Sequence, residues 1–320
     1  QGVVVNTCLL KTAWPPTLAN SVSVRYCPVG FIFDTKGSMG FPYRNELIKY
    51  FTGLINSSTS EIFLEVLAPT LDFNLVSMKQ IPMIIDRVDE VTELVNECIQ
   101  LSKADWNNFE VSWDFMKHPL VVPGCSLLSE AYWIWEKKCK NSFDHLMENE
   151  EKLNRIFAEI YGLENEIDCH VLPDNVTIRK ADKARDIKSL ISYAIGCMFG
   201  RYSLDADGLV YAGGKWDDSK YVTYPADKDN IIPICDDEYF DDDIVGRFVK
   251  FIETVYGKET LKENLKFIAD ALGGQGSPKE IIRNYFLNEF YANHCNDYQT
   301  PSTGKRPIYW LFDSGKKNGF

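Results

Sequence analysis

The sequence predicts an α+β fold that is rich in helix, with a strand-containing N-terminal lobe, a long helical connector and a mainly helical C-terminal lobe. Three observations lead to this prediction. β-Branched and aromatic residues alternate with turn residues over 3–41, apolar residues then recur at helical spacing, and one helical pattern runs unbroken over about 126–161. The 320 residues, 45% of them hydrophobic, can bury sizeable cores. We place the three regions at 1–105, 106–178 and 179–320.

The N-terminal lobe is expected to begin with short strands, the clearest over 30–34, where aromatic and β-branched residues follow a turn. The apolar period then changes to that of a helix over 45–57. A second helix is predicted over 60–67, and Ser60 could cap it. A third helix is predicted over 86–104, because its apolar residues recur in alternating steps of three and four. Its acidic first turn also suits the positive end of a helix dipole.

The connector is predicted to contain one long helix that Ser126 or Ser129 opens and that ends near Tyr161, since its apolar residues stay on one side. In the C-terminal lobe, Pro278 after Ser277 is typical of a capped helix start. The other elements that we expect in this lobe are helices over 183–201, around 245–255, over 261–272 and over 278–291, loop and strand over 208–224, and a buried strand over 307–312.

The net negative charge argues against a protein that binds nucleic acid over its whole surface. The chain has 34 basic and 46 acidic side chains, a net charge of −12, so any DNA contact must be local. The segment 205–270 is acidic, whereas 274–320 has more basic than acidic residues, which suggests two different surfaces. Nine cysteines without a Cys-x-x-Cys pair, and no stretch long enough to span a bilayer, lead us to expect reduced thiols, a cytoplasmic location and no membrane partner.

Residues that carry catalysis are scarce. The four histidines lie at 118, 145, 170 and 294 without the spacing of a zinc site, and no glycine motif for phosphate binding is present. We therefore expect no catalytic residue, no cofactor-binding residue and no metal ligand in this chain.

Two acidic segments could bind a metal ion or serve a metal-dependent nuclease, but each has a simpler structural explanation. The dense carboxylates of 236–243 could bind Ca²⁺ or Mg²⁺, but they lack the ordered spacing of a calcium loop. We prefer a solvated acidic face at a helix N-terminus. Glu150, Glu151 and Lys152 offer the residue types of a metal-dependent nuclease, but within a long helix this pattern is typical of exposed surface.

Two groups of residues are candidates for DNA contact. The first flanks the aromatic strand expected over 307–312 and consists of Lys305, Arg306, Lys316 and Lys317. Positive charge beside flat aromatic surface suits phosphate contact and base stacking, although a core strand with solvated ends explains the same pattern. The second group surrounds a Gly-Ser turn, for which a plain hairpin is an equal explanation, and consists of Arg25, Lys36, Ser38 and Arg44.

Several segments resemble a known family. RYCPVGFIFD at 25–34, together with the segments that follow it in the first hundred residues, resembles the region after the catalytic domain in large adenine-specific DNA methyltransferases. More specific segments are AEIYGL at 158–163, KSLISYAIGCMFGRY at 188–202 and PIYWLFDSGKKNGF at 307–320. Together they resemble the PglX family, the methyltransferases of the BREX phage-defence systems, through nearly the whole chain.

This resemblance implies transfer of a methyl group from S-adenosylmethionine to the N6 atom of adenine in DNA. The family's catalytic domain carries a glycine-containing cofactor motif and an Asn-Pro-Pro-Tyr type motif that holds the flipped adenine. Neither motif is present, because Trp14-Pro15-Pro16-Thr17 lacks the polar residue before the prolines and the aromatic residue after them. The chain thus resembles the part downstream of the catalytic domain, where target recognition resides, and 1–105 is the region that we expect to be target-recognition-like.

The resemblance also implies the partners: double-stranded DNA, the missing catalytic domain of the same parent chain and, as a further class, other phage-defence proteins. S-adenosylmethionine would be a cofactor of the parent protein and not of this chain. Our hypothesis is that the chain supplies DNA specificity and a clamp surface in company with that domain. The competing hypothesis is an acidic, aromatic-rich docking module that never reads bases, and a nuclease ranks lowest.

Overall fold

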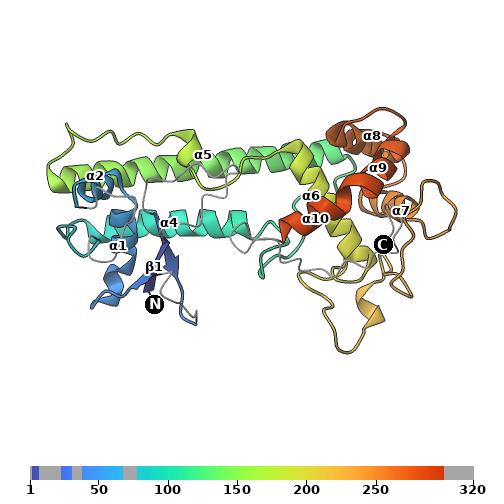
Figure 1. The fold of residues 1–320 in the computed structure, drawn as a ribbon, viewed down its shortest axis with the longest axis horizontal. Helices are drawn as coiled ribbons and strands as arrows, with labels where there is room; N and C mark the ends of the chain where they lie inside the picture. Colours follow the sequence, from blue (N-terminus) through green and yellow to red (C-terminus); the bar gives the residue numbers. More distant parts are fainter. Residues whose placement is uncertain (1, 7–22, 31–37, 68–77, 299–320) are drawn as a thin grey trace. The chain divides into compact units, whose positions relative to one another are not determined.

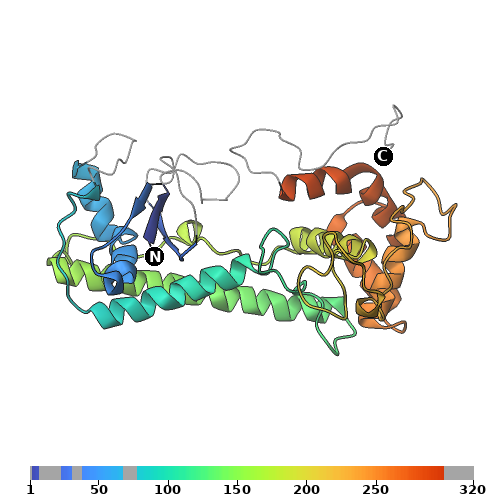
Figure 2. The ribbon, with the colours of Figure 1, turned by 90° about the horizontal axis from the view of Figure 1, so that it is seen from below.

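The chain folds mainly into helices, as predicted (Figures 1 and 2). None of the helices within the described ranges is both long and apolar enough to cross a bilayer. The ranges that the computed structural model describes are 2–6, 23–30, 38–67 and 78–298.

Contacts divide the chain into two compact units, and each unit is made of two segments. The helix α5, Leu128–Tyr161, contributes residues to both units, so the predicted connector over 106–178 is divided between them. The first unit comprises Gln1–Asp105 and Lys140–Arg179, and the second comprises Trp106–Cys139 and Lys180–Phe320.

The first unit contains a small antiparallel sheet. Its central strand β1, Gly2–Asn6, lies between β2, Ser23–Cys27, and β3, Ser38–Gly40. Short strands in this part of the chain are therefore confirmed. The strand expected over 30–34 falls outside the described residues except for Gly30, which lies in a turn with a φ of 105°.

Two helices of the first unit pack on the second part of α5. They are α1, Ile48–Ile55, which a 3-10 turn at Asn45–Leu47 precedes, and α4, Val88–Trp106, and they confirm the helices predicted over 45–57 and 86–104. Gly53 permits close approach, because a Cβ there would lie 2.9 Å from the Val95 side chain. The buried residues of this core are Leu47, Tyr50, Leu54, Val91, Val95, Leu153, Ile156 and Phe157.

The helix α2, Ser58–Leu67, begins two residues before the predicted start. The prediction that Ser60 caps it is wrong. Ser60 is fully buried, and its hydroxyl donates to the Leu54 carbonyl oxygen at 2.6 Å. Because α2 already begins at Ser58, Ser60 lies inside its first turn, and its hydroxyl bonds back to a carbonyl at the end of α1 instead of capping α2.

The second unit is built around α6, Lys183–Met198, whose N-cap Asp182 accepts from the Arg185 amide at 2.7 Å. Its core joins α6 to the first part of α5 and to the helices that follow. Ser277 and Glu280 form a capping box at the start of α9, which confirms the predicted helix start. The following elements are α7, Ile244–Tyr256; α8, Leu261–Leu272; α9, Pro278–Tyr285; a π-helical turn, Phe286–Phe290; and α10, Tyr291–Asp297.

The strand expected within 208–224 is not formed. The structure has loop there, with only a short 3-10 turn at Asp218–Lys220. Side chains hold this loop: the Trp216 and Tyr221 rings stack at 4.4 Å, and Ser203 Oγ donates to the Lys220 carbonyl at 2.5 Å. Aromatic residues that favour a strand are used here to pack a loop on its own unit.

The Trp216 ring lies against Gly200, which allows a sharp test of this loop. Gly200 has a φ of 73°, and a Cβ there would lie 2.4 Å from the ring. We predict that Gly200→Ala lowers the free energy of unfolding by about 2–4 kcal/mol, the sum of backbone strain and overpacking. Gly124→Ala is the control, because Gly124 has a φ of 77° and open space around it, and should cost about 1–2 kcal/mol. Equal losses in urea unfolding would show that the ring does not pack there.

Candidate nucleic-acid interface

The structure describes three of the residues predicted to contact DNA, and all three belong to the first unit. Arg25 lies on β2 and Ser38 begins β3, and the register places them on either side of β1, beside Val4 and Val5 respectively. Arg44 ends the loop between β3 and the 3-10 turn before α1. The other predicted residues lie outside the described ranges: Lys36, Lys305, Arg306, Lys316 and Lys317.

Arg25 is half-buried, and its positive charge interacts with the carboxyl group of Glu150 on α5. Burial lowers the pKa of Arg25, and the nearby Glu150 opposes that change. Burial likewise raises the pKa of Glu150 to about 7, and Arg25 opposes that rise. The prediction that Glu150 belongs to exposed helix surface is therefore wrong, although Lys152 is exposed. Arg25 thus partly offsets the effect of burial on the pKa of the half-buried Glu150, and its role in DNA contact stays a prediction.

Arg44 lies in an exposed loop with two aromatic side chains. Phe41 is 59% exposed, the Tyr43 ring is fully exposed, and the Arg44 side chain is 65% exposed. Arg44 Nε donates to Glu46 Oε1 at 2.8 Å, and this hydrogen bond lowers the pKa of Glu46. We call Phe41–Arg44 the aromatic-basic loop.

The aromatic-basic loop combines the chemistry that single bases and phosphates require. A flat ring can stack on a base with little regard to sequence, and a guanidinium can pair with a phosphate. Its aromatic members were missed in the sequence because Phe41 and Tyr43 look like ordinary strand residues there. The available signal was their position beside Arg44 and Pro42, where a proline interrupts a strand.

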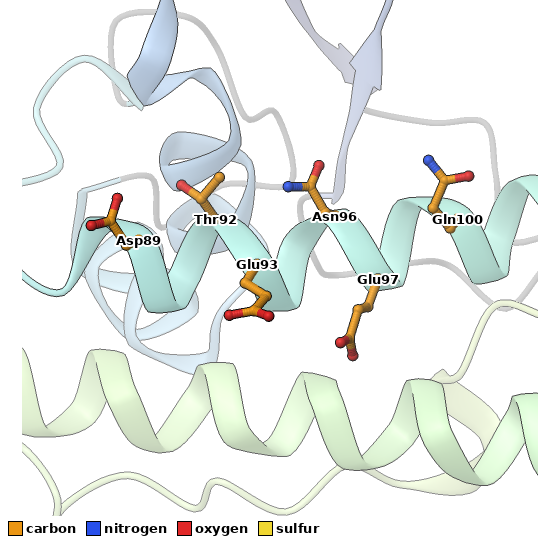
Figure 3. A pocket seen from close by; sticks show the side chains of 6 residues that line it. All are labelled: Asp89, Thr92, Glu93, Asn96, Glu97 and Gln100. Carbon is orange, nitrogen blue, oxygen red and sulfur yellow. The ribbon is translucent and has the colours of Figure 1, made fainter.

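A polar surface depression of about 450 Å³, wide open to solvent, lies along one face of α4, and we call it the α4 cavity. Figure 3 shows Glu93 and Glu97 on one side of the helix axis and Thr92, Asn96 and Gln100 on the other. Three carboxylates line it, since Asp89 completes the set, and they would repel a phosphate backbone. The cavity is therefore a poor place for DNA.

The same cavity does not fit S-adenosylmethionine, the methyl donor that the resemblance implies. A nucleoside site needs apolar or aromatic walls for the adenine ring together with a few polar groups. Every described residue that lines the α4 cavity is polar or charged. Within the described residues, no group of three His, Cys, Asp or Glu side chains could hold a metal ion.

The acidic segment 236–243 is anchored by one buried carboxylate. Asp243 is 1% exposed, caps α7 by accepting from the Val245 and Gly246 amides, and pairs with both terminal nitrogens of Arg283 at 2.8 and 2.9 Å. Asp243 lies at the N-terminus of α7, in agreement with the position that we preferred for these acids, but it is buried, so the expectation of a solvated carboxylate is wrong for this residue. Arg283 also donates to the Cys235 and Asp237 carbonyls at 2.8 and 3.4 Å.

The tip of this segment carries two aromatic residues among exposed acids. Tyr239 is 66% exposed and Phe240 is 54% exposed. Because Arg283 fixes the base of the segment, these side chains project from an ordered loop. We call Asp236–Asp242 the acidic-aromatic loop.

A polar cluster in the second unit surrounds Glu110. The Tyr298 hydroxyl donates to Glu110 Oε2 at 2.9 Å, whereas Glu110 Oε1 is buried and has no hydrogen-bond partner. The Arg201 guanidinium lies over the rings of Tyr202 and Tyr298, 5.4 and 5.3 Å from their centroids. Burial raises the pKa of Glu110 to about 7, and Tyr298 and Arg201 oppose the rise.

Two histidines of the second unit are held by neighbouring groups of that unit. His118 is 3% exposed, and burial lowers its pKa to about 3. His294 Nδ1 lies 2.9 Å from Ser192 Oγ, and burial lowers its pKa to about 4. Both are therefore neutral near pH 7. The eight cysteines within the described ranges are all free thiols.

The Glu110 cluster predicts a pH dependence of stability. Because the pKa of Glu110 is raised from 4.5 to about 7 by folding, its contribution is present in full below pH 4.5 and is lost as the pH rises to about 7. We predict that Glu110→Gln removes this loss and raises the free energy of unfolding at pH 8 by about 1–3 kcal/mol. Glu136→Gln, on the exposed face of α5, should leave the profile unchanged. A Glu110→Gln profile parallel to that of the wild type would contradict the assignment.

Comparison with known proteins identifies two similar sequences. No family model matches the chain. The adenine-specific methyltransferase PglX of Lacticaseibacillus casei (strain Zhang) is 42% identical over 316 residues, which cover 96% of this chain and 26% of that protein. The adenine-specific methyltransferase BrxX of Escherichia coli O9:H4 (strain HS) is 36% identical over an alignment of 341 residues, which covers 96% of this chain and 27% of that protein.

The chain spans about a quarter of the length of these curated relatives. The alignments include nearly all of it, at identities well above the level at which a fold alone is shared. The chain is thus similar over almost its whole length to one part of PglX-like adenine-specific methyltransferases, which confirms the resemblance found in its sequence.

Proposed function

We propose that this chain is the DNA target-recognition and clamp part of an N6-adenine DNA methyltransferase of phage defence. The observation that carries the proposal is the alignment of 96% of the chain with about a quarter of an adenine-specific methyltransferase at 42% identity. Under this proposal the catalytic domain and the site for S-adenosylmethionine lie on the part of the enzyme outside this chain, double-stranded DNA is the substrate, and the enzyme acts in the cytoplasm.

The chemistry explains why such an enzyme needs a separate recognition part. An adenine inside a duplex must leave the stack before its amino group can be methylated, which costs a few kcal/mol. Contacts to phosphates hold the duplex in register, and contacts to base edges or unstacked bases select the target. The aromatic-basic loop offers a ring for stacking and a guanidinium for phosphate, which supports a role in this step.

The electrostatics support a recognition part that acts together with the rest of the enzyme. A net charge of −12 opposes a DNA backbone at long range. The Arg44 guanidinium is already paired with Glu46, so its net gain from a phosphate is small. DNA must therefore be attracted chiefly by charges outside this chain, and these residues add local selectivity.

A docking module is the second candidate function, and the acidic-aromatic loop favours it. Interfaces draw much of their binding energy from a few aromatic residues, with charge complementarity around them. Tyr239 and Phe240 are such residues, and the exposed acids beside them would suit a basic partner. This candidate requires no contact between the chain and DNA.

Two double variants of the full-length methyltransferase separate these functions. We predict that Tyr43→Ala/Arg44→Ala weakens duplex DNA binding by about 1–3 kcal/mol through lost stacking. The slope of log K against log salt concentration should also fall by about 1, the amount expected for one lost phosphate contact. Tyr239→Ala/Phe240→Ala, which removes two exposed aromatic rings of the second unit, should leave DNA binding unchanged. Fluorescence anisotropy at several salt concentrations measures both. Unchanged binding in the first variant, with loss of partner assembly in the second, would favour the docking module.

A further inference from the structure

The segment Pro82–Asp86 of the first unit, which leads into α4, is held by two tyrosine hydroxyls. The Tyr161 hydroxyl donates to the Pro82 carbonyl at 2.6 Å and accepts from the Ile84 amide at 3.2 Å. The Tyr50 hydroxyl donates to the Ile84 carbonyl at 2.9 Å and accepts from the Asp86 amide at 3.4 Å. Each hydroxyl therefore bridges two backbone groups that are two residues apart.

This alternation is that of an extended strand. In an extended chain the amide and carbonyl of one residue point to the same side, and those of the next residue point to the opposite side. Residues 82, 84 and 86 bond to the tyrosines, so the amides and carbonyls of Met83 and Ile85 form the opposite edge. These four groups make no hydrogen bond with any described part of the chain. The two hydroxyls thus occupy the place of a neighbouring strand on one edge and leave the other edge unpaired.

The side chains along the same segment are apolar and exposed. Met83 is 43% exposed, Ile84 is 45% exposed and Ile85 is 48% exposed. Proteins protect open strand edges with charged residues, prolines or bulges, because an open edge pairs with other chains. Here Pro82 stands at one end and Asp86 at the other, and the three residues between them have no such protection.

We propose that this open edge pairs with an extended, uncharged strand from the part of the same methyltransferase that lies outside this chain. The inference rests on the proposed function, since it requires the chain to be part of a longer enzyme. The unpaired amides and carbonyls of Met83 and Ile85 can form hydrogen bonds only with a partner backbone that is extended. The exposed apolar side chains of Met83, Ile84 and Ile85 favour uncharged side chains in that partner. This is strand addition to an exposed edge, with the tyrosine hydroxyls holding the edge in position.

The size of the edge decides between an attached and an independent partner. A stable contact between separate molecules buries about 1,200–2,000 Å², and three exposed residues on an edge offer far less. A second copy of this chain is therefore a poor occupant. A strand on the same polypeptide acts at an effective concentration of about millimolar, so a small contact suffices. The chain spans about a quarter of its relatives, so a methyltransferase of that length has ample further sequence to supply the strand.

Amide hydrogen exchange tests the proposal, with an internal control in the same segment. We expect the amides of Met83 and Ile85 to exchange at least about tenfold more slowly in the full-length methyltransferase than in this chain alone. The amides of Ile84 and Asp86, which already bond to Tyr161 and Tyr50, should change little. Met83→Asp/Ile85→Asp in the full-length protein should abolish the slowing, because a charged strand edge resists pairing.

Leu172→Asp, at another exposed apolar residue of the first unit, should leave the slowing in place. Equal exchange of Met83 and Ile85 in the two proteins would overturn the proposal. Slowing that appears in this chain alone and grows with its concentration would also overturn it, and would identify a second copy as the occupant. The measurement uses no DNA, so a full-length protein that protects the edge but fails to methylate adenine would contradict the proposed function alone.

Discussion

The apolar stripe of α5 is the constraint on which both cores depend. Its first turns supply Leu128, Ala131, Trp135 and Cys139 to the core of the second unit, and its last turns supply Leu153, Ile156 and Phe157 to the core of the first. The helix contains neither proline nor glycine, so nothing in its sequence interrupts it. Because one continuous helix completes both cores, a break within α5 would expose apolar surface in each unit.

Most of the polar chemistry in the described residues serves this architecture. Asp186 accepts from the Trp135 indole and from the Arg185 guanidinium, and Asp243 pairs with Arg283. Such buried charges are tolerated because hydrogen bonds surround them, and removing one partner would leave an uncompensated charge. The groups left for an external partner lie on loops and edges: the aromatic-basic loop, the acidic-aromatic loop and the strand edge at Met83 and Ile85. This distribution agrees with the proposal that the chain positions DNA or a protein partner through its loops and strand edge.

The sequence was sufficient where local signals decide the structure. The helix α8 begins and ends where predicted, because Gly273 follows its last turn, and the Ser277 cap of α9 carries its own capping box. It was insufficient where tertiary contacts decide. Helical spacing alone did not show that Glu150 faces inward, and strand-like residues within 208–224 lack a partner strand in the described structure. In the candidate site, the charge of Arg44 was enough to make it a candidate, whereas the exposure of Tyr43 depends on the path of the loop and could not be predicted.

A salt-dependent titration of duplex DNA with this chain and with the full-length methyltransferase tests the central claim most directly. The account predicts tight, sequence-selective binding by the full-length enzyme and only weak, unselective binding by this chain. The reason is that a chain with a net charge of −12 is repelled by the DNA backbone. Tight, sequence-specific binding by this chain alone at physiological salt would contradict it.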